Sequence, residues 1–249
     1  MIKKLIALLV IMLIFCTLAF AQETSSPQMS NIPLLNTFFE NATIVDNPYV
    51  VGGVDMGSYD AFSTFKIGAK GGIPFGKNMQ IGAQLDYVNF SYDSDVIDSQ
   101  SGISDLLVVA RNNWMMEKFL LTAGGKVTLP IGSEDVGAGN MDFGAFCSIR
   151  YPMSDMITLN GTLGLDFIEM GDDRETSLML NFGSTYMIND KINALGELTM
   201  KTEFDFTQLM GGVDYNLSDK GRVRAGLGLG LDDGAPDLQL RAAYIMNIM

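Results

Sequence analysis

The chain has 249 residues with 16 basic and 29 acidic side chains, no histidine, and a formal net charge of −13 at pH 7. This balance argues against nucleic acid as a partner, because binding to phosphates needs a surplus of positive charge. Histidine is the side chain that most often serves as a general base, so we predict no enzymatic activity and no catalytic residue. The length suits one β-barrel or one large β domain.

Residues 1–21 have the three parts of an export signal. Lys3 and Lys4 form the basic start, an apolar run spans residues 5–15, and Ala19-Phe20-Ala21 is a small-residue cleavage site. The apolar run is short for a permanent anchor helix, which must cross a hydrocarbon core of about 30 Å. We therefore predict a signal peptide that is cleaved after Ala21.

Residues 22–48 separate this signal from the first predicted strand. They contain the apolar side chains Leu34, Leu35, Phe38 and Phe39. This spacing suits one or two turns of an amphipathic helix, and it equally suits a short plug inserted into a barrel. We interpret residues 22–48 as a periplasmic segment and keep both structures open.

From Tyr49 onward, apolar and polar residues alternate with the period of two that is typical of strands. Residues 78–92 show it best, with Met79 and Ile81 on one face and Gln80 and Gln84 on the other. The pattern predicts twelve strands, at 49–57, 61–74, 78–92, 103–114, 118–131, 140–151, 156–169, 175–188, 191–203, 207–217, 221–231 and 237–248. Tight turns follow the even-numbered strands, and longer acidic loops follow the third and fifth, as in bacterial outer-membrane barrels.

The charged residues of these strands all fall on the face opposite the apolar one. An Arg or Lys that faces lipid at mid-depth costs about 2–4 kcal/mol, so this face must be the inner one. We predict an all-β fold: a closed antiparallel transmembrane β-barrel of about twelve strands, an up-and-down meander over residues 49–249. The alternative is a water-soluble β-sandwich or lipocalin, because alternation alone does not say which face is inside.

The predicted lumen carries charges of both signs. The residues that we predict to line the transport path are Lys66, Lys70, Asp105, Arg111, Lys126, Asp142, Arg150, Asp166, Glu197, Lys201, Arg222, Arg224 and Arg241, and further acids on this face are Asp55, Asp86, Glu203 and Asp214. If bases and acids line opposite sides, the field favours small anions or zwitterions. If they pair across the wall, the lumen is filled.

No metal site or cofactor is predicted. Cys147 falls on the predicted lipid face and no Cys/His cluster exists. Carboxylates of the outer loops could bind calcium or magnesium, although solvated charge is the simpler interpretation.

Four short motifs lie at strand-loop junctions: Gly102–Leu106, Leu129–Gly132, Gly137–Asp142 and Asp233–Asp237. With them, the chain from about residue 37 to its end resembles the outer-membrane proteins grouped as "MetA-pathway of phenol degradation". Two positions depart from the family pattern: Ile131 replaces the Thr of Leu-Pro-Thr-Gly, and Met249 replaces an aromatic last residue. The resemblance implies transport of small, often aromatic compounds, and it assigns no residue a role.

We therefore predict a channel or transporter of the Gram-negative outer membrane for passive passage of small solutes, including small aromatic or other hydrophobic compounds. Its bore should be narrower than that of 16- to 18-stranded porins. The expected partners are outer-membrane lipid and lipopolysaccharide, the barrel-assembly machinery and the solute. The alternative is a non-conducting structural barrel of the envelope. Uptake of apolar compounds through a lateral opening is a third hypothesis, which requires apolar side chains inside; the candidates are Phe62, Val88, Phe90, Leu107, Val109, Phe146, Leu195 and Ile245.

Overall fold

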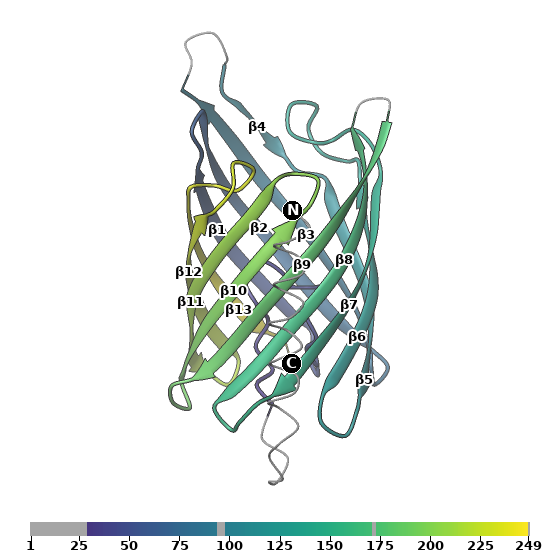
Figure 1. Cartoon of the computed structure of the whole chain (residues 1–249), viewed down its shortest axis with the longest axis vertical. Coiled ribbons are helices and arrows are strands. Elements are labelled where there is room, and N and C mark those ends of the chain that lie inside the picture. Colours follow the sequence, from purple (N-terminus) through teal and green to yellow (C-terminus); the bar gives the residue numbers. More distant parts are fainter. Residues whose placement is uncertain (1–28, 94–97, 171–172, 249) are drawn as a thin grey trace, which may run out of the picture.

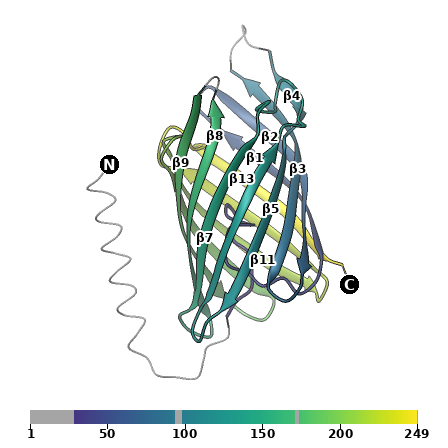
Figure 2. The ribbon, with the colours of Figure 1, turned by 90° about the vertical axis from the view of Figure 1, so that its right-hand side faces the viewer.

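The computed structural model describes residues 29–93, 98–170 and 173–248, so the predicted signal peptide lies outside the described residues. These residues form an antiparallel sheet that closes into a barrel with tilted strands (Figures 1 and 2). Its strands are β1 (Tyr49–Ser58), β2 (Phe62–Phe75), β3 (Met79–Tyr92), β4 (Gln100–Ile103), β5 (Leu106–Met115), β6 (Leu120–Leu129), β7 (Asp142–Pro152), β8 (Ile157–Met170), β9 (Asp173–Met187), β10 (Ile192–Lys201), β11 (Phe206–Ser218), β12 (Gly221–Gly230) and β13 (Leu238–Asn247).

The barrel closes where β1 pairs with both β2 and β13, with Tyr49 opposite Asn247. Pairing follows the order of the chain, except that β4 and β5 both pair with β3 and are two parts of one barrel strand. The prediction of a twelve-stranded up-and-down barrel is thereby confirmed. In the described part of the chain, no helix is long and apolar enough to cross a membrane.

The predicted strand 103–114 is wrong in one respect, because it is interrupted at Ser104 and Asp105. At the break, the N–H of Asp86 donates to the Ser104 hydroxyl (3.0 Å), and the Asp105 carboxylate accepts hydrogen bonds from the N–H groups of Gly132 (2.9 Å) and Ala138 (2.7 Å). Three of the four family-like motifs therefore meet here. At the interruption, regular strand pairing is lost, and the Asp105 side chain instead binds the loop that follows β6.

The two ends of the barrel differ. One, the turn end, has tight connections such as that between β2 and β3, where Gly76 adopts the left-handed conformation (φ +66°) that favours glycine. The other, the loop end, carries the longer connections after β6 and β12. Tyr49 and Asn247, the two ends of the barrel wall, both lie at the turn end.

Apolar side chains face outward along the strands. On β12, Leu227 is 47% exposed and Leu229 45% exposed, whereas Arg224 is 3% exposed. A soluble sandwich would bury these leucines, so the alternative fold is wrong. Cys147 is exposed on this outer face.

Residues 29–48, which we call the N-terminal segment, lie inside the barrel without regular secondary structure (Figure 1). Turns and bends over residues 35–41 replace the helical turns that the spacing allowed. Two buried apolar clusters connect the segment to the wall. The first contains Phe38, Phe39, Tyr49, Val51, Val109, Phe146 and Ile245, and the second contains Ile32, Leu34, Leu35, Leu195 and Met210.

A charge placed on the outer face tests the orientation of the wall. We expect Leu227→Arg, near the middle of β12, to lower the free energy of unfolding by about 2–4 kcal/mol, and Leu217→Arg, at the turn end of β11, by only about 0–1 kcal/mol, since the cost falls toward the interface. Urea titration in lipid vesicles measures both. Equal effects of the two substitutions would contradict a lipid-facing outer surface.

Candidate functional site

Glu197 of β10 is the acceptor that holds the turn of the N-terminal segment. Its side chain is 2% exposed. The carboxylate accepts five hydrogen bonds: from the N–H groups of Leu35 (2.9 Å), Asn36 (2.8 Å) and Thr37 (3.1 Å), from the Thr37 hydroxyl (2.9 Å) and from the Asn181 amide (2.7 Å). A buried carboxylate is tolerated when its lone pairs are satisfied, and here three of the five donors are main-chain groups that no regular structure pairs.

Two buried arginines bind the carbonyl groups of the same segment. Arg111 of β5 donates to the carbonyl oxygens of Phe39 (3.1 Å), Asn41 and Thr43 (2.9 Å). Arg150 of β7, which is fully buried, donates to the carbonyl oxygens of Ser30 and Ile32 (2.8 Å) and to the Asn41 side chain. Neither guanidinium has a carboxylate within ion-pair distance among the described residues, so carbonyl dipoles take the place of a counter-ion.

Two ion pairs also extend to the segment. Arg224 binds Asp214 across β11 and β12, with N–O distances of 2.8 and 2.6 Å, and donates to the Leu34 carbonyl (3.2 Å). Arg241 of β13 pairs with Asp55 and donates to the Leu35 carbonyl (3.1 Å) and the Asn36 side chain (2.7 Å).

Lys126 of β6 links the segment to the wall through two acids. Its ammonium lies 3.0 Å from Glu40 of the segment and 2.9 Å from Asp166 of β8. The Asp166 side chain lies over Gly144 of the neighbouring strand β7, where a Cβ atom would overlap the carboxylate. The glycine therefore creates the space in which the acid reaches the lysine.

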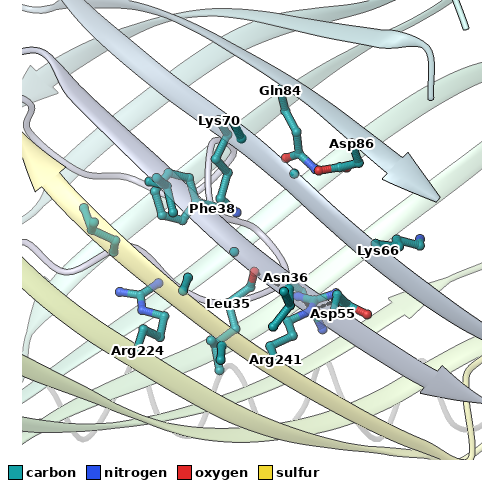
Figure 3. A pocket seen from close by; sticks show the side chains of 18 of the residues that line it. Leu35, Asn36, Phe38, Asp55, Lys66, Lys70, Gln84, Asp86, Arg224 and Arg241 are labelled. Carbon is teal, nitrogen blue, oxygen red and sulfur yellow. Dashed lines mark hydrogen bonds and ion pairs between the residues drawn. The ribbon is translucent and has the colours of Figure 1, made fainter. Parts of the chain in front are cut away.

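Two cavities lie on opposite sides of the segment. The loop-side cavity, of about 250 Å³, is lined by Phe38 of the segment and by Lys66, Lys70, Asp86 and Arg241 of the wall, among others (Figure 3). The turn-side cavity, of about 270 Å³, is lined by Thr43, Arg222 and Asn247, among others. They share no lining residue, so the N-terminal segment separates them.

The remaining predicted lumen residues have other surroundings. Arg222 lies 3.9 Å from Asp214. Lys201 lies near the Phe206 ring, with 5.4 Å between the ammonium and the ring centroid. Asp142 accepts a hydrogen bond from the N–H of Glu169 (2.9 Å) at the loop end. Glu203 is exposed in the turn after β10, outside the wall.

The apolar side chains expected inside are there, and half of them belong to the buried clusters formed with the segment. Val109, Phe146 and Ile245 belong to the first cluster and Leu195 to the second, while Val88 is buried and Phe62, Phe90 and Leu107 are half-buried. Sequence reasoning missed Glu40 and Asn181, because their importance depends on a segment that contacts strands far away in the chain. Within the described ranges, no three His, Cys, Asp or Glu side chains gather as ligands for a metal ion.

A closed barrel with an apolar outer face and a charged lumen defines an outer-membrane β-barrel. The chain belongs to the family described as "Putative MetA-pathway of phenol degradation", whose model matches residues 45–248. No curated protein sequence matches it.

Solved structures share the fold. The COG4313 outer membrane channel from Pseudomonas putida F1 superposes with a TM-score of 0.73 at 13% identity, covering 86% of this chain and 100% of that one. The KdgM porin gives 0.60 at 11% identity, covering 81% and 99%. The CymD monoaromatic hydrocarbon channel gives 0.52 at 9% identity, covering 90% and 95%. This chain is accordingly an outer-membrane protein.

Glu197 allows a direct test of how the segment is held. In Glu197→Gln an amide donor replaces one acceptor oxygen and faces the N–H groups of the segment. We expect a loss of about 2 kcal/mol of local stability, because a hydrogen bond to a charged group contributes about 1.5–3 kcal/mol, and hence roughly thirtyfold faster hydrogen exchange at residues 35–37. Glu175→Gln, on an exposed part of β9, is the control with the same change of charge. Unchanged exchange in Glu197→Gln would show that the apolar clusters alone hold the segment.

Proposed function

We propose that this chain is an outer-membrane channel for passive passage of small solutes. The observation that carries the proposal is a closed barrel with a charged inner wall and a cavity on each side of the N-terminal segment. The structural relatives named as channels and porins support it, and the CymD monoaromatic hydrocarbon channel extends the proposed solutes to small aromatic compounds. The charged wall of a narrow barrel selects solutes by size and sign.

In this proposal residues 22–48 are a plug and residues 1–21 a signal peptide removed on export from a Gram-negative cell. The turn end faces the periplasm and the loop end the exterior, as in other bacterial barrels. Among the described residues, the hydrogen bonds between the plug and the wall involve wall side chains, except that the Pro48 carbonyl, next to β1, accepts a hydrogen bond from the N–H of Ile248 (2.7 Å). The other main-chain bonds of the barrel run between its own strands. Displacement of the plug would therefore leave the main-chain bonds between the strands intact.

The proposed partners are the lipids and proteins of the outer membrane, and no enzymatic reaction is proposed. The apolar outer face contacts lipid and lipopolysaccharide, and the barrel-assembly machinery inserts it. A chain without histidine, with most of its inner charges engaged in ion pairs and plug contacts, acts as a conduit and not as an enzyme.

A non-conducting structural barrel is the second candidate. It is favoured by the two apolar clusters and the polar contacts that fill the lumen around the segment. The two candidates differ in whether current passes.

Planar-bilayer recordings in KCl distinguish them. We expect a small, stable current from the intact protein and a severalfold larger one after deletion of residues 29–43, because the deletion joins the two cavities. Cysteines at Leu34 and Gly183, in a Cys147→Ser background, supply the matched closed state. A Cβ atom at Gly183 would overlap the methyl groups of Leu34, so the two positions are neighbours, and a disulfide requires a Cβ–Cβ separation of about 3.5–4.5 Å.

Oxidation of this pair should hold the current at its minimum, and reduction should restore it in the same protein. The slower gel migration of the boiled protein checks that each variant forms a closed barrel. A barrel that stays silent without residues 29–43 would reject the channel and leave the structural role.

A further inference from the structure

We infer that the loop-side cavity is a binding site for small aromatic carboxylates, with Lys70 of β2 binding the carboxylate and Phe38 of the segment contacting the ring. The inference rests on the proposed function and deepens it by naming a class of solute.

Lys70 has no carboxylate within 4 Å among the described residues. It lies opposite Val51 on β1 and Gln84 on β3. The nearest acid in the register is Asp86, whose side chain lies over Gly68 on the neighbouring strand. The Asp86 carboxylate accepts a hydrogen bond from the Gln84 amide (2.7 Å). The contact that Lys70 makes is with the Phe38 ring, whose centroid lies 4.0 Å from the ammonium. An ammonium in such a site lacks a counter-ion, which an anionic ligand would provide.

Lys66 lies nearer the loop end on the same strand and is also without a counter-ion in the described structure. Asp55 stands directly opposite it on β1, but the Asp55 carboxylate is occupied by Arg241 and by the Gln239 amide (2.9 Å). Lys66 and Lys70 are four residues apart on one strand, about 13 Å along its axis. They therefore form two successive cationic positions on the way from the loop end to the segment (Figure 3).

The other acids of the cavity do not neutralise these lysines. Glu40 binds Lys126, and Arg224 at the edge of the cavity binds Asp214. Asp86 is the one acid of this lining without a base within ion-pair distance among the described residues, so two unpaired positive charges face one unpaired negative charge, although the chain as a whole carries a charge of −13. A cationic ligand would meet two unpaired ammonium groups and is disfavoured.

The side of the cavity next to Lys70 is apolar. It is formed by Phe38 with Val51, Leu107 and Ile245. A volume of about 250 Å³ is slightly below the ~300–1,000 Å³ typical of ligand sites, which favours a single ring over a larger ligand. An anion with an aromatic body uses both the ammonium and this apolar surface, whereas acetate or chloride uses only the first.

Equilibrium dialysis of the purified full chain in uncharged detergent tests the site, with detergent alone as the blank. The probes are benzoate, benzyl alcohol, which has the ring without the charge, and acetate, which has the charge without the ring. We expect benzoate to bind at least tenfold more tightly than either. Lys70→Gln should remove this preference, Lys70→Arg should retain most of it, and Lys66→Gln should weaken binding a few-fold. Lys77→Gln, in the exposed turn of the same hairpin, is the control with the same loss of charge.

Each contrary result overturns the inference. Equal benzoate affinity of Lys70→Gln and the unaltered protein would show that Lys70 does not bind the carboxylate. Benzyl alcohol that binds as tightly as benzoate would show that the charge of the ligand does not contribute. Acetate that binds as tightly as benzoate would show that the ring does not contribute. Dialysis needs no current, so failure here with conduction intact leaves the channel standing. Binding of benzoate to a silent barrel would instead reject the channel and keep the site.

Discussion

The structure depends on one constraint, that a strand crossing hydrocarbon must keep its charges and its main-chain polar groups away from lipid. Closure satisfies the main chain, since β1 pairs with both β2 and β13 and leaves no edge. The alternation of side chains then sends every inward position of a strand to a lumen only twelve strands in circumference. Charges that avoid lipid are thereby concentrated in a narrow interior, where each of them needs a partner.

The N-terminal segment and the wall provide those partners for each other. An irregular segment leaves its own N–H and C=O groups unpaired, and buried groups of this kind must find donors and acceptors elsewhere. Glu197 accepts the N–H groups of one turn, while Arg111 and Arg150 donate to carbonyl groups on either side of it. The segment buries charges of the wall and its polar groups satisfy them, while these charges in turn satisfy the irregular main chain of the segment. Each explains why the other is tolerated.

Almost every strand of the barrel was predicted from the sequence. The alternation of apolar and polar residues shows which face of a strand points outward, and the residue composition of the connections shows where the turns lie. The pairing of Arg224 with Asp214 follows from the register of adjacent strands. The partners of Arg111 and Glu197 do not, because they belong to a segment about 70 and 160 residues away whose path no local pattern encodes. The predictions of an unbroken strand through Ser104 and of an inward-facing Glu203 were wrong at the loop end. Side-chain hydrogen bonds interrupt the first strand there, and β10 ends at Lys201, next to Thr202, whose hydroxyl accepts a hydrogen bond from the N–H of Leu178.

The balance of partners also explains why a filled lumen still contains a cavity. Acids near β2 are held by neighbours other than its lysines: Asp55 by Arg241, and Glu40 by Lys126. A wall built only for stability would place a carboxylate against each ammonium, since an unpaired buried cation is unfavourable. At Lys70 the structure places the ring of Phe38 instead. An unpaired cation makes the empty site unfavourable, so an anion that binds beside it gains free energy. In the proposed channel, this site lies where a solute from the loop end would first meet the segment.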